Sequence, residues 1–196
     1  MTMKLNRFAL AGILTVALLA PALFAASALA HKEAYSKLGA VYPRRVKEAP
    51  KFSLKDLNGK TVQLKDLRGK PVLLNFWGTW CQACKEELPS MQRLHEMMKD
   101  EGVQVIAVSI DRADPEKVRE YIDHYKVTFP VLLDPDQETR RRYFIMGLPT
   151  SYLIDAEGNL RGFVSGSRDW DSETSQKVMR ILLNKEFNAG DRKSVV

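Results

Sequence analysis

The sequence predicts an α/β protein in which one central mixed sheet is flanked by helices on both faces. Two largely apolar runs, Val72 to Trp77 and Val103 to Ile110, are typical of strands buried on both sides. Each run is followed by a segment with helical spacing of its apolar residues, and an apolar hairpin and a last helix complete the pattern. These three observations favour strands alternating with helices over an all-helical or all-strand domain.

The N-terminus has the pattern of an export signal. Lys4 and Arg7 precede an uncharged, largely apolar stretch from Phe8 to Ala30. Ala28-Leu29-Ala30 fits the small-x-small rule for cleavage, which would leave a chain that begins at His31. If it is not cut, the same stretch is long enough to span a bilayer. Residues 1–30 are therefore a signal peptide or an uncleaved membrane anchor, and both interpretations place the folded part outside the cytoplasm.

Composition then divides the rest of the chain into three parts. Residues 31–50 are polar and basic, with Pro43 and Pro50 breaking regularity, and are interpreted as a linker or an irregular arm. Residues 51–187 form one domain, and residues 188–196 form a C-terminal tail. Within the domain, the similar units 52–60 and 62–70 each alternate apolar and polar residues before a glycine turn. They predict a small antiparallel hairpin at the edge of the sheet.

The remaining elements follow from apolar periodicity and turn residues. Asp114-Pro115 is a typical helix start, and Glu157-Gly158-Asn159 is the turn of a hairpin. The predicted helices are 81–99, with Pro89 inside it, one beginning at Asp114, 137–143 and 172–187. The predicted strands, besides the two apolar runs, are 129–133, 150–154 and 160–164.

Charge gives little indication of a charged partner. The formal net charge is +6, and loss of the leader would remove two of these positive charges. Arg140-Arg141-Arg142 is the only dense basic cluster, and no aromatic residues are interleaved with it. We interpret it as a solvated helix face and expect no nucleic-acid binding.

Both cysteines of the chain, Cys81 and Cys84, lie three residues apart where the first apolar run gives way to a helix. Unpaired N–H groups at a helix N-terminus stabilise a thiolate, and two cysteines one turn apart can close a disulfide. A zinc site is disfavoured because there is no second cysteine pair and the three histidines are scattered. A purely structural bridge over so short a loop would restrict the unfolded chain very little. The pair is therefore interpreted as a redox couple that needs no added cofactor and no metal.

These motifs together resemble the thioredoxin-like superfamily. The resemblance rests on Phe76 to Cys84, on Pro89, and on Gly147-Leu148-Pro149-Thr150 before a strand, and it covers roughly Phe52 to Leu183. It is closest to the exported TlpA/ResA/DsbE-type thiol–disulfide oxidoreductases. The resemblance implies a thioredoxin-like fold with an N-terminal β-hairpin.

The resemblance also implies roles for individual residues. Cys81 is expected to be the attacking sulfur and Cys84 the buried, resolving sulfur. Trp80, directly before the pair, is expected to shield the site and to offer a flat contact surface. Pro149 matches the cis-proline of the family, and Leu148, Pro149 and Thr150 are expected to contact an extended substrate by strand addition.

Two neighbouring positions concern protons and thiolate stability. Asn75 stands where many thioredoxins have a buried Asp, and Asn cannot titrate. Glu87, three residues past the second cysteine, matches a Glu of the branch and is expected to exchange a proton with Cys84 if it is partly desolvated. The alternative interpretation is that Glu87 is a solvated helix carboxylate, like Glu86. Ala83 replaces the usual proline, and its N–H could donate towards the sulfur of Cys81 and make the disulfide more oxidising.

The leading functional hypothesis is an extracytoplasmic disulfide reductase. It would receive electrons from a membrane donor and reduce protein disulfides, with apocytochrome c as one possible substrate. An oxidase or isomerase remains open, because the motif does not give the direction of electron flow. A copper-handling protein and a peroxiredoxin-like peroxidase are disfavoured by the cysteine spacing, by the histidines and by the lack of a Thr-x-x-Cys context.

Overall fold

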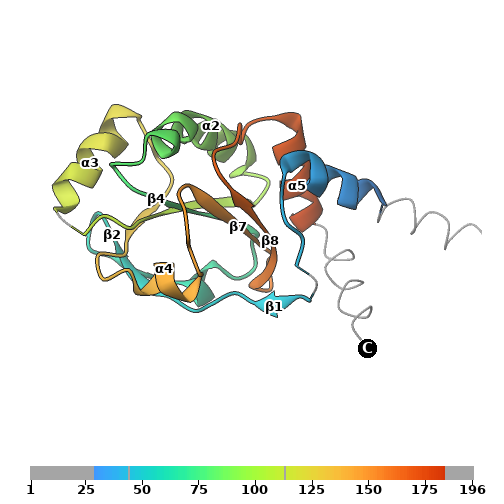
Figure 1. The fold of residues 1–196 in the computed structure, drawn as a ribbon, viewed down its shortest axis with the longest axis horizontal. Helices are drawn as coiled ribbons and strands as arrows, with labels where there is room; N and C mark the ends of the chain where they lie inside the picture. Colours follow the sequence, from blue (N-terminus) through green and yellow to red (C-terminus); the bar gives the residue numbers. More distant parts are fainter. Residues whose placement is uncertain (1–28, 44, 113, 184–196) are drawn as a thin grey trace, which may run out of the picture.

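The computed structural model describes residues 29–43, 45–112 and 114–183. Its centre is one mixed sheet of eight strands in the order β1-β8-β7-β4-β5-β6-β2-β3 (Figure 1). The strands are β1 (Lys47–Glu48), β2 (Ser53–Asp56), β3 (Thr61–Gln63), β4 (Val72–Trp77), β5 (Gln104–Ser109), β6 (Val131–Leu133), β7 (Thr150–Ile154) and β8 (Asn159–Ser165). β4, β5 and β6 are parallel, whereas all other neighbouring pairs are antiparallel.

Helices cover both faces of this sheet, as predicted. They are α2 (Gln82–Met98), α3 (Pro115–His124), α4 (Glu138–Arg142) and α5 (Glu173–Leu183), with a 3-10 helix at Leu64–Leu67. The apolar side chains of α2, α3 and α5 belong to one buried cluster, and those of the 3-10 helix and of the segment after α4 belong to the other. Figure 1 shows α4 on the face of the sheet opposite α2. The predicted α/β architecture is therefore confirmed.

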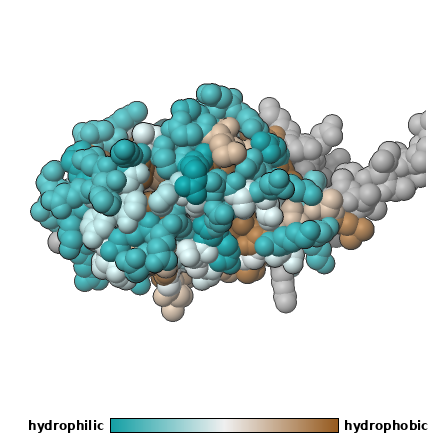
Figure 2. Space-filling model, turned by 90° about the horizontal axis from the view of Figure 1, so that it is seen from above, coloured by the Kyte–Doolittle hydropathy of each residue, from teal (hydrophilic) through white to brown (hydrophobic). Residues whose placement is uncertain are grey.

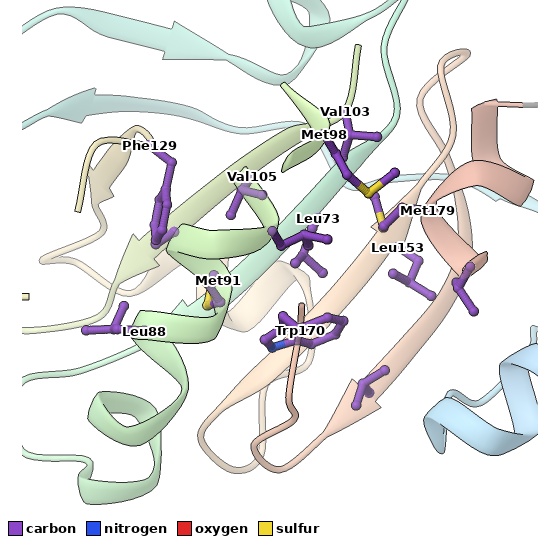
Figure 3. Close-up of a cluster of buried hydrophobic side chains, with 14 of the residues drawn as sticks. Leu73, Leu88, Met91, Met98, Val103, Val105, Phe129, Leu153, Trp170 and Met179 are labelled. Carbon is purple, nitrogen blue, oxygen red and sulfur yellow. The ribbon is translucent and has the colours of Figure 1, made fainter. Parts of the chain in front are cut away.

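The alternation of side chains along β4 divides it between the two clusters. Leu73 and Trp77 face the α2 cluster, while Leu74 and Phe76 face the other cluster. Figure 3 shows the α2 cluster, in which Leu88, Met91 and Met98 of α2 pack with strand residues and with Trp170. Because these helices turn their apolar sides to the sheet, the surface seen from above is mostly hydrophilic (Figure 2).

The interpretation of residues 31–50 as a linker is wrong. Residues 29–38 are helical and lie beside α5 (Figure 1), and β1 pairs with β8. Ala34, Tyr35 and Leu38 are buried in the α2 cluster. Their spacing puts them on one face of a helix, so a segment that is polar on average still buries a narrow apolar stripe.

The two similar units near the start of the domain have different structures. β2 and β3 pair antiparallel at one end of the sheet. The second unit, however, leaves the strand after Gln63 and continues as the 3-10 helix. Leu64 and Leu67 are buried in the cluster on the α4 side, so burial of these two side chains takes precedence over further pairing.

Three further expectations concern the chain ends. Residues 1–28 and 184–196 lie outside the described residues, and with them most of the leader, the C-terminal tail and the end of the last predicted helix. Among the described residues, no helix is both long and apolar enough to cross a membrane.

The long helix α2 runs from Gln82 to Met98 through Pro89, close to its predicted bounds.

Candidate active site

The cysteine pair lies at the junction of β4 and α2. Cys81 has an extended backbone and is the N-cap of α2, and its Sγ accepts a hydrogen bond from the N–H of Cys84 at 3.2 Å. The two sulfurs are bonded to each other. Cys81 is 8% exposed, whereas Cys84 is completely buried. Of the two sulfurs, Cys81 is therefore the one that another molecule can reach.

The hydrogen bond to Cys81 also bears on Ala83. The expectation from the sequence was that the N–H of Ala83 could donate towards the Cys81 sulfur. In the oxidised pair, the N–H that reaches Cys81 Sγ is that of Cys84, which closes the first turn of the helix. That the N–H of Ala83 stabilises the Cys81 thiolate of the reduced pair stays a prediction.

Trp80 is a surface residue rather than a core residue. Its side chain is 66% exposed, and its indole lies close to the backbone of Gly78. A Cβ placed on Gly78 would lie 2.9 Å from Trp80 Nε1, so only glycine lets the indole lie in this position. The exposure of Trp80 supports the predicted contact surface beside Cys81, and its contact with a substrate stays a prediction.

The loop that carries Trp80 is held by a residue that the sequence analysis missed. The carboxylate of Asp111 accepts hydrogen bonds from the N–H of Thr79 at 3.0 Å and from the hydroxyl of Thr79 at 2.7 Å. The hydroxyl of Ser109 donates to the same carboxylate at 2.8 Å. Asp111 follows the end of β5, which is parallel to β4, and the carboxyl ends of parallel strands meet at one edge of a sheet. The position of Asp111 directly after this predicted strand was the feature of the sequence from which its role could have been predicted.

The peptide bond between Leu148 and Pro149 is cis, as the family resemblance implies. In the antiparallel pair of β4 and β7, Thr150 lies opposite Phe76, so Leu148 and Pro149 lie beside the residues that lead to Cys81. The hydroxyl of Thr150 is buried and donates to the carbonyl of Gly147 at 2.8 Å. Thr150 therefore shapes this segment, while Gly147 and part of Leu148 form its surface.

Glu87 is a buried carboxyl group, and the expectation of a desolvated side chain holds. Its side chain is 2% exposed and accepts three hydrogen bonds: from Asn75 Nδ2 at 2.7 Å, from Trp170 Nε1 at 3.1 Å and from the N–H of Arg168 at 3.2 Å. Burial raises the pKa of Glu87 from 4.5 to about 7, against the opposing effects of these donors and of the Arg168 charge. The alternative of a solvated carboxylate is excluded.

The position of Glu87 links it to the buried sulfur. It follows Cys84 by three residues on α2, so the two side chains lie on the same side of the helix, one turn apart. Figure 3 shows Trp170 beside α2, with its ring among the side chains of the cluster. The partners Arg168 and Trp170 come from the loop between β8 and α5, some eighty residues away in sequence, and the sequence analysis did not find them.

Metal ligation receives no support from the described residues. Among them, no group of three or more His, Cys, Asp or Glu side chains is placed to hold an ion. That the redox couple works without a metal or cofactor stays a prediction.

Fold and site define a class of protein: a thioredoxin-like domain with a disulfide-bonded cysteine pair at a helix N-terminus. A family model described as AhpC/TSA matches residues 46–163. The chain belongs to this family.

Relatives within this family indicate the class of enzyme more closely. Thiol-disulfide oxidoreductase ResA of Bacillus thuringiensis subsp. konkukian is 41% identical over 122 residues, which cover 62% of this chain and 70% of the relative. ResA of Bacillus subtilis is 40% identical over 120 residues, with 61% of this chain and 66% of the relative covered. The protein is accordingly a thiol–disulfide oxidoreductase.

Solved structures give the same result. The thioredoxin domain of a thiol-disulfide oxidoreductase from Bacteroides vulgatus has a TM-score of 0.61 and 29% identity, with 69% of this chain and 96% of that one covered. A thiol:disulfide interchange protein of the thioredoxin family from Chlorobium tepidum has a TM-score of 0.61 and 28% identity, with 70% and 99% covered. The thioredoxin-like fold is therefore shown by structure as well as by sequence.

Proposed function

We propose that this protein reduces disulfides of other proteins outside the cytoplasm, through the Cys81–Cys84 pair. The observation that carries the proposal is the unequal burial of the two cysteines: Cys81, at a helix N-terminus, keeps 8% of its surface exposed, whereas Cys84, one turn before Glu87, is completely buried. An accessible sulfur suits attack on a partner, and a buried sulfur suits resolution of the resulting intermediate.

The reaction has two displacement steps. The thiolate of Cys81 attacks one sulfur of the substrate disulfide, which forms a mixed disulfide and releases the first substrate thiolate. The thiolate of Cys84 then attacks Cys81 Sγ, which releases the second substrate thiolate and closes the Cys81–Cys84 disulfide. Two electrons pass to the substrate in total, and a thiol donor must supply two electrons to reopen the pair.

Glu87 is the proton carrier for the second step in this proposal. Cys84 has no access to water, so its thiol needs a nearby group to take its proton before it attacks. A carboxyl whose pKa is about 7 is ionised in part of the molecules near neutral pH and can accept that proton. When the pair is reduced again, the same carboxyl returns it.

The location and the partners belong to the same proposal. The leader pattern of residues 1–30 supports export, by a cleaved signal or an anchor in the inner membrane. Substrates are proteins with disulfides, apocytochrome c among the candidates, and electrons come from a membrane donor. The exposed Trp80 and the accessible part of Leu148, next to the buried Pro149, are the proposed contact sites for the substrate chain.

Trapping of mixed disulfides tests the assignment of the sulfurs. We expect Cys84→Ser to accumulate mixed disulfides through Cys81, because the resolving attack is lost, and Cys81→Ser to accumulate almost none. Non-reducing gels of exported proteins from cells that express each variant measure this. Equal trapping by both variants would contradict the assignment.

The reduction potential of the pair tests the direction of electron flow. A value near that of thioredoxin, about −270 mV, supports the reductase. A value near −120 mV would instead indicate an enzyme that introduces disulfides.

A further inference from the structure

The helical segment of residues 29–38 reaches the active site through Arg168. The Nε–H of Arg168 donates to the carbonyl oxygen of Leu38 at 2.8 Å, and the backbone N–H of the same residue donates to Glu87 Oε2 at 3.2 Å. One residue of the loop between β8 and α5 therefore binds the N-terminal helix with its side chain and the buried carboxyl with its main chain. We call residues 166–172 the clamp loop.

The end of the N-terminal helix is built to receive this guanidinium. Gly39 has a φ of +71°, and the N–H groups of Gly39 and Ala40 bond back to the carbonyls of Ser36 and Tyr35. This left-handed ending turns the chain while the carbonyl of Leu38 stays open to another donor. A cation is also favourable at the negative end of a helix.

Gly39 has a second role at the same contact. A Cβ placed on it would lie 2.8 Å from Arg168 Nη2, so the guanidinium lies against the bare Cα of this glycine. The close approach is possible only because position 39 has no side chain. The contact thus depends on both sides, on Arg168 from the clamp loop and on Gly39 from the N-terminal helix.

Other contacts attach the clamp loop to α2. The hydroxyl of Ser90 donates to the carbonyl of Arg168 at 3.3 Å and accepts from the N–H of Trp170 at 3.1 Å. The indole of Trp170 donates to Glu87. On the outer side of α2, Arg93 forms an ion pair with Asp171. The clamp loop is therefore held by α2 and by the N-terminal helix together.

We propose that Arg168 is a positioning residue of the exchange reaction, and that the N-terminal helix, by binding its guanidinium, keeps the clamp loop on Glu87 and so sets the pH at which Glu87 exchanges its proton. The proposal rests on the proposed role of Glu87 as the proton carrier. It assigns residues 29–40 to the redox site, although they precede the domain expected from the sequence.

The electrostatics around Glu87 agree with this assignment. From the clamp loop, Arg168 contributes a positive charge and an N–H, and both lower the pKa of Glu87 against the larger effect of burial. From β4 the facing group is the neutral amide of Asn75, which also donates to Ser151 of β7. From α2 it is the Cys84 thiol of the reduced enzyme. Loss or displacement of the Arg168 guanidinium should therefore raise the pKa of Glu87 and favour its protonated form.

A two-phase reaction with an aromatic disulfide measures the step concerned. When the reduced full-length protein meets the reagent, attack by Cys81 releases one coloured thiolate, and attack by Cys84 on the mixed disulfide releases a second. The rate of the second release against pH gives the half-maximal pH of the step that needs Glu87.

The main variants are Arg168→Met, which keeps the aliphatic stem, and Gly39→Ala, which displaces the guanidinium without changing Arg168. We expect both to raise the half-maximal pH of the second release by about half a pH unit or more. Arg168→Lys, which keeps the charge, should shift it less. Arg93→Met is the matched control, because it removes another arginine bound to the clamp loop, and it should leave the half-maximal pH unchanged.

The Glu87→Gln background separates the possible failures. There, Arg168→Met should cause no shift, because the titrating group is gone. If Glu87→Gln alone leaves the pH profile unchanged, the role of Glu87 itself is wrong. If Glu87→Gln changes the profile but neither Arg168→Met nor Gly39→Ala shifts it, the positioning role of Arg168 is overturned. Circular dichroism and the melting temperature show whether each variant is folded. If Arg168→Met does not fold, the result for Gly39→Ala decides whether the positioning role of Arg168 holds.

Discussion

Asp155 and Glu87 are buried carboxyl groups near opposite ends of the strand β7, and they are partnered in different ways. Asp155, just after β7, forms an ion pair with the buried Arg161, with Oδ2 and Nε 2.6 Å apart, and accepts from the N–H of Asn159 at 2.8 Å. Glu87, near the other end of β7, accepts only N–H groups of an amide, an indole and the backbone.

The difference shows what makes a buried carboxyl structural or reactive. A cation in direct contact compensates the negative charge of Asp155, and the pair closes the turn between β7 and β8. Neutral donors only partly replace water around Glu87, so its protonated and ionised forms are close in free energy at neutral pH. Glu87, the carboxyl group that has no cation in direct contact, lies one helical turn from the buried Cys84.

The largest expected effect is at the structural carboxyl. Arg161→Met should lower the free energy of unfolding by about 3–5 kcal/mol, because it leaves Asp155 buried without its cation. The exchange rate of the molecules that remain folded should not change. Denaturant unfolding of the oxidised protein and the two-phase assay measure these quantities. A loss below about 1 kcal/mol would mean that the pair is not a structural element.

Glu87 should make stability depend on pH in the opposite sense to an ordinary carboxylate. The folded state holds the Glu87 proton up to about pH 7, and the unfolded state releases it near pH 4.5. Between these values the folded state binds more protons, so the free energy of unfolding falls as pH rises, by about 3 kcal/mol in total. Glu87→Gln should lack this fall. Parallel curves of the two proteins across this range would contradict the prediction.

The smallest expected effect is kinetic. Glu87→Gln should slow the second thiolate release about tenfold at pH 7, because Cys84 loses its proton acceptor, while the first release at Cys81 is unchanged. Glu86→Gln is the matched control: Glu86 is exposed on the adjacent position of α2, and its loss should affect neither phase. Equal slowing of both phases by Glu87→Gln would indicate a structural effect and not proton transfer.

The sequence predicted the parts of the site that are local in the chain. Cys81, Cys84 and Glu87 lie on one helix, and their spacing alone places them together. Arg168 and Trp170 could not be predicted in the same way, because only the completed sheet and the clamp loop bring them to Glu87. Nor did composition show that residues 29–38 form a packed helix, since a few buried side chains decide this.

A repeated sequence shows the same limit of local prediction. Leu54 to Leu57 and Leu64 to Leu67 share the letters Leu-Lys-Asp-Leu. The first copy is largely β-strand and pairs with β6, whereas the second is a 3-10 helix that buries both of its leucines. Identical residues therefore adopt different structures, and tertiary contacts decide between them.

Direct titration of Glu87 tests the central claim most directly. The carboxyl carbon of Glu87, labelled with carbon-13 and identified by comparison with Glu87→Gln, can be followed by NMR across pH in the oxidised protein. The account predicts a midpoint near pH 7, set by burial among neutral donors. A midpoint near 4.5, the ordinary value, would show that Glu87 is already ionised in acid and would contradict its role as the proton carrier.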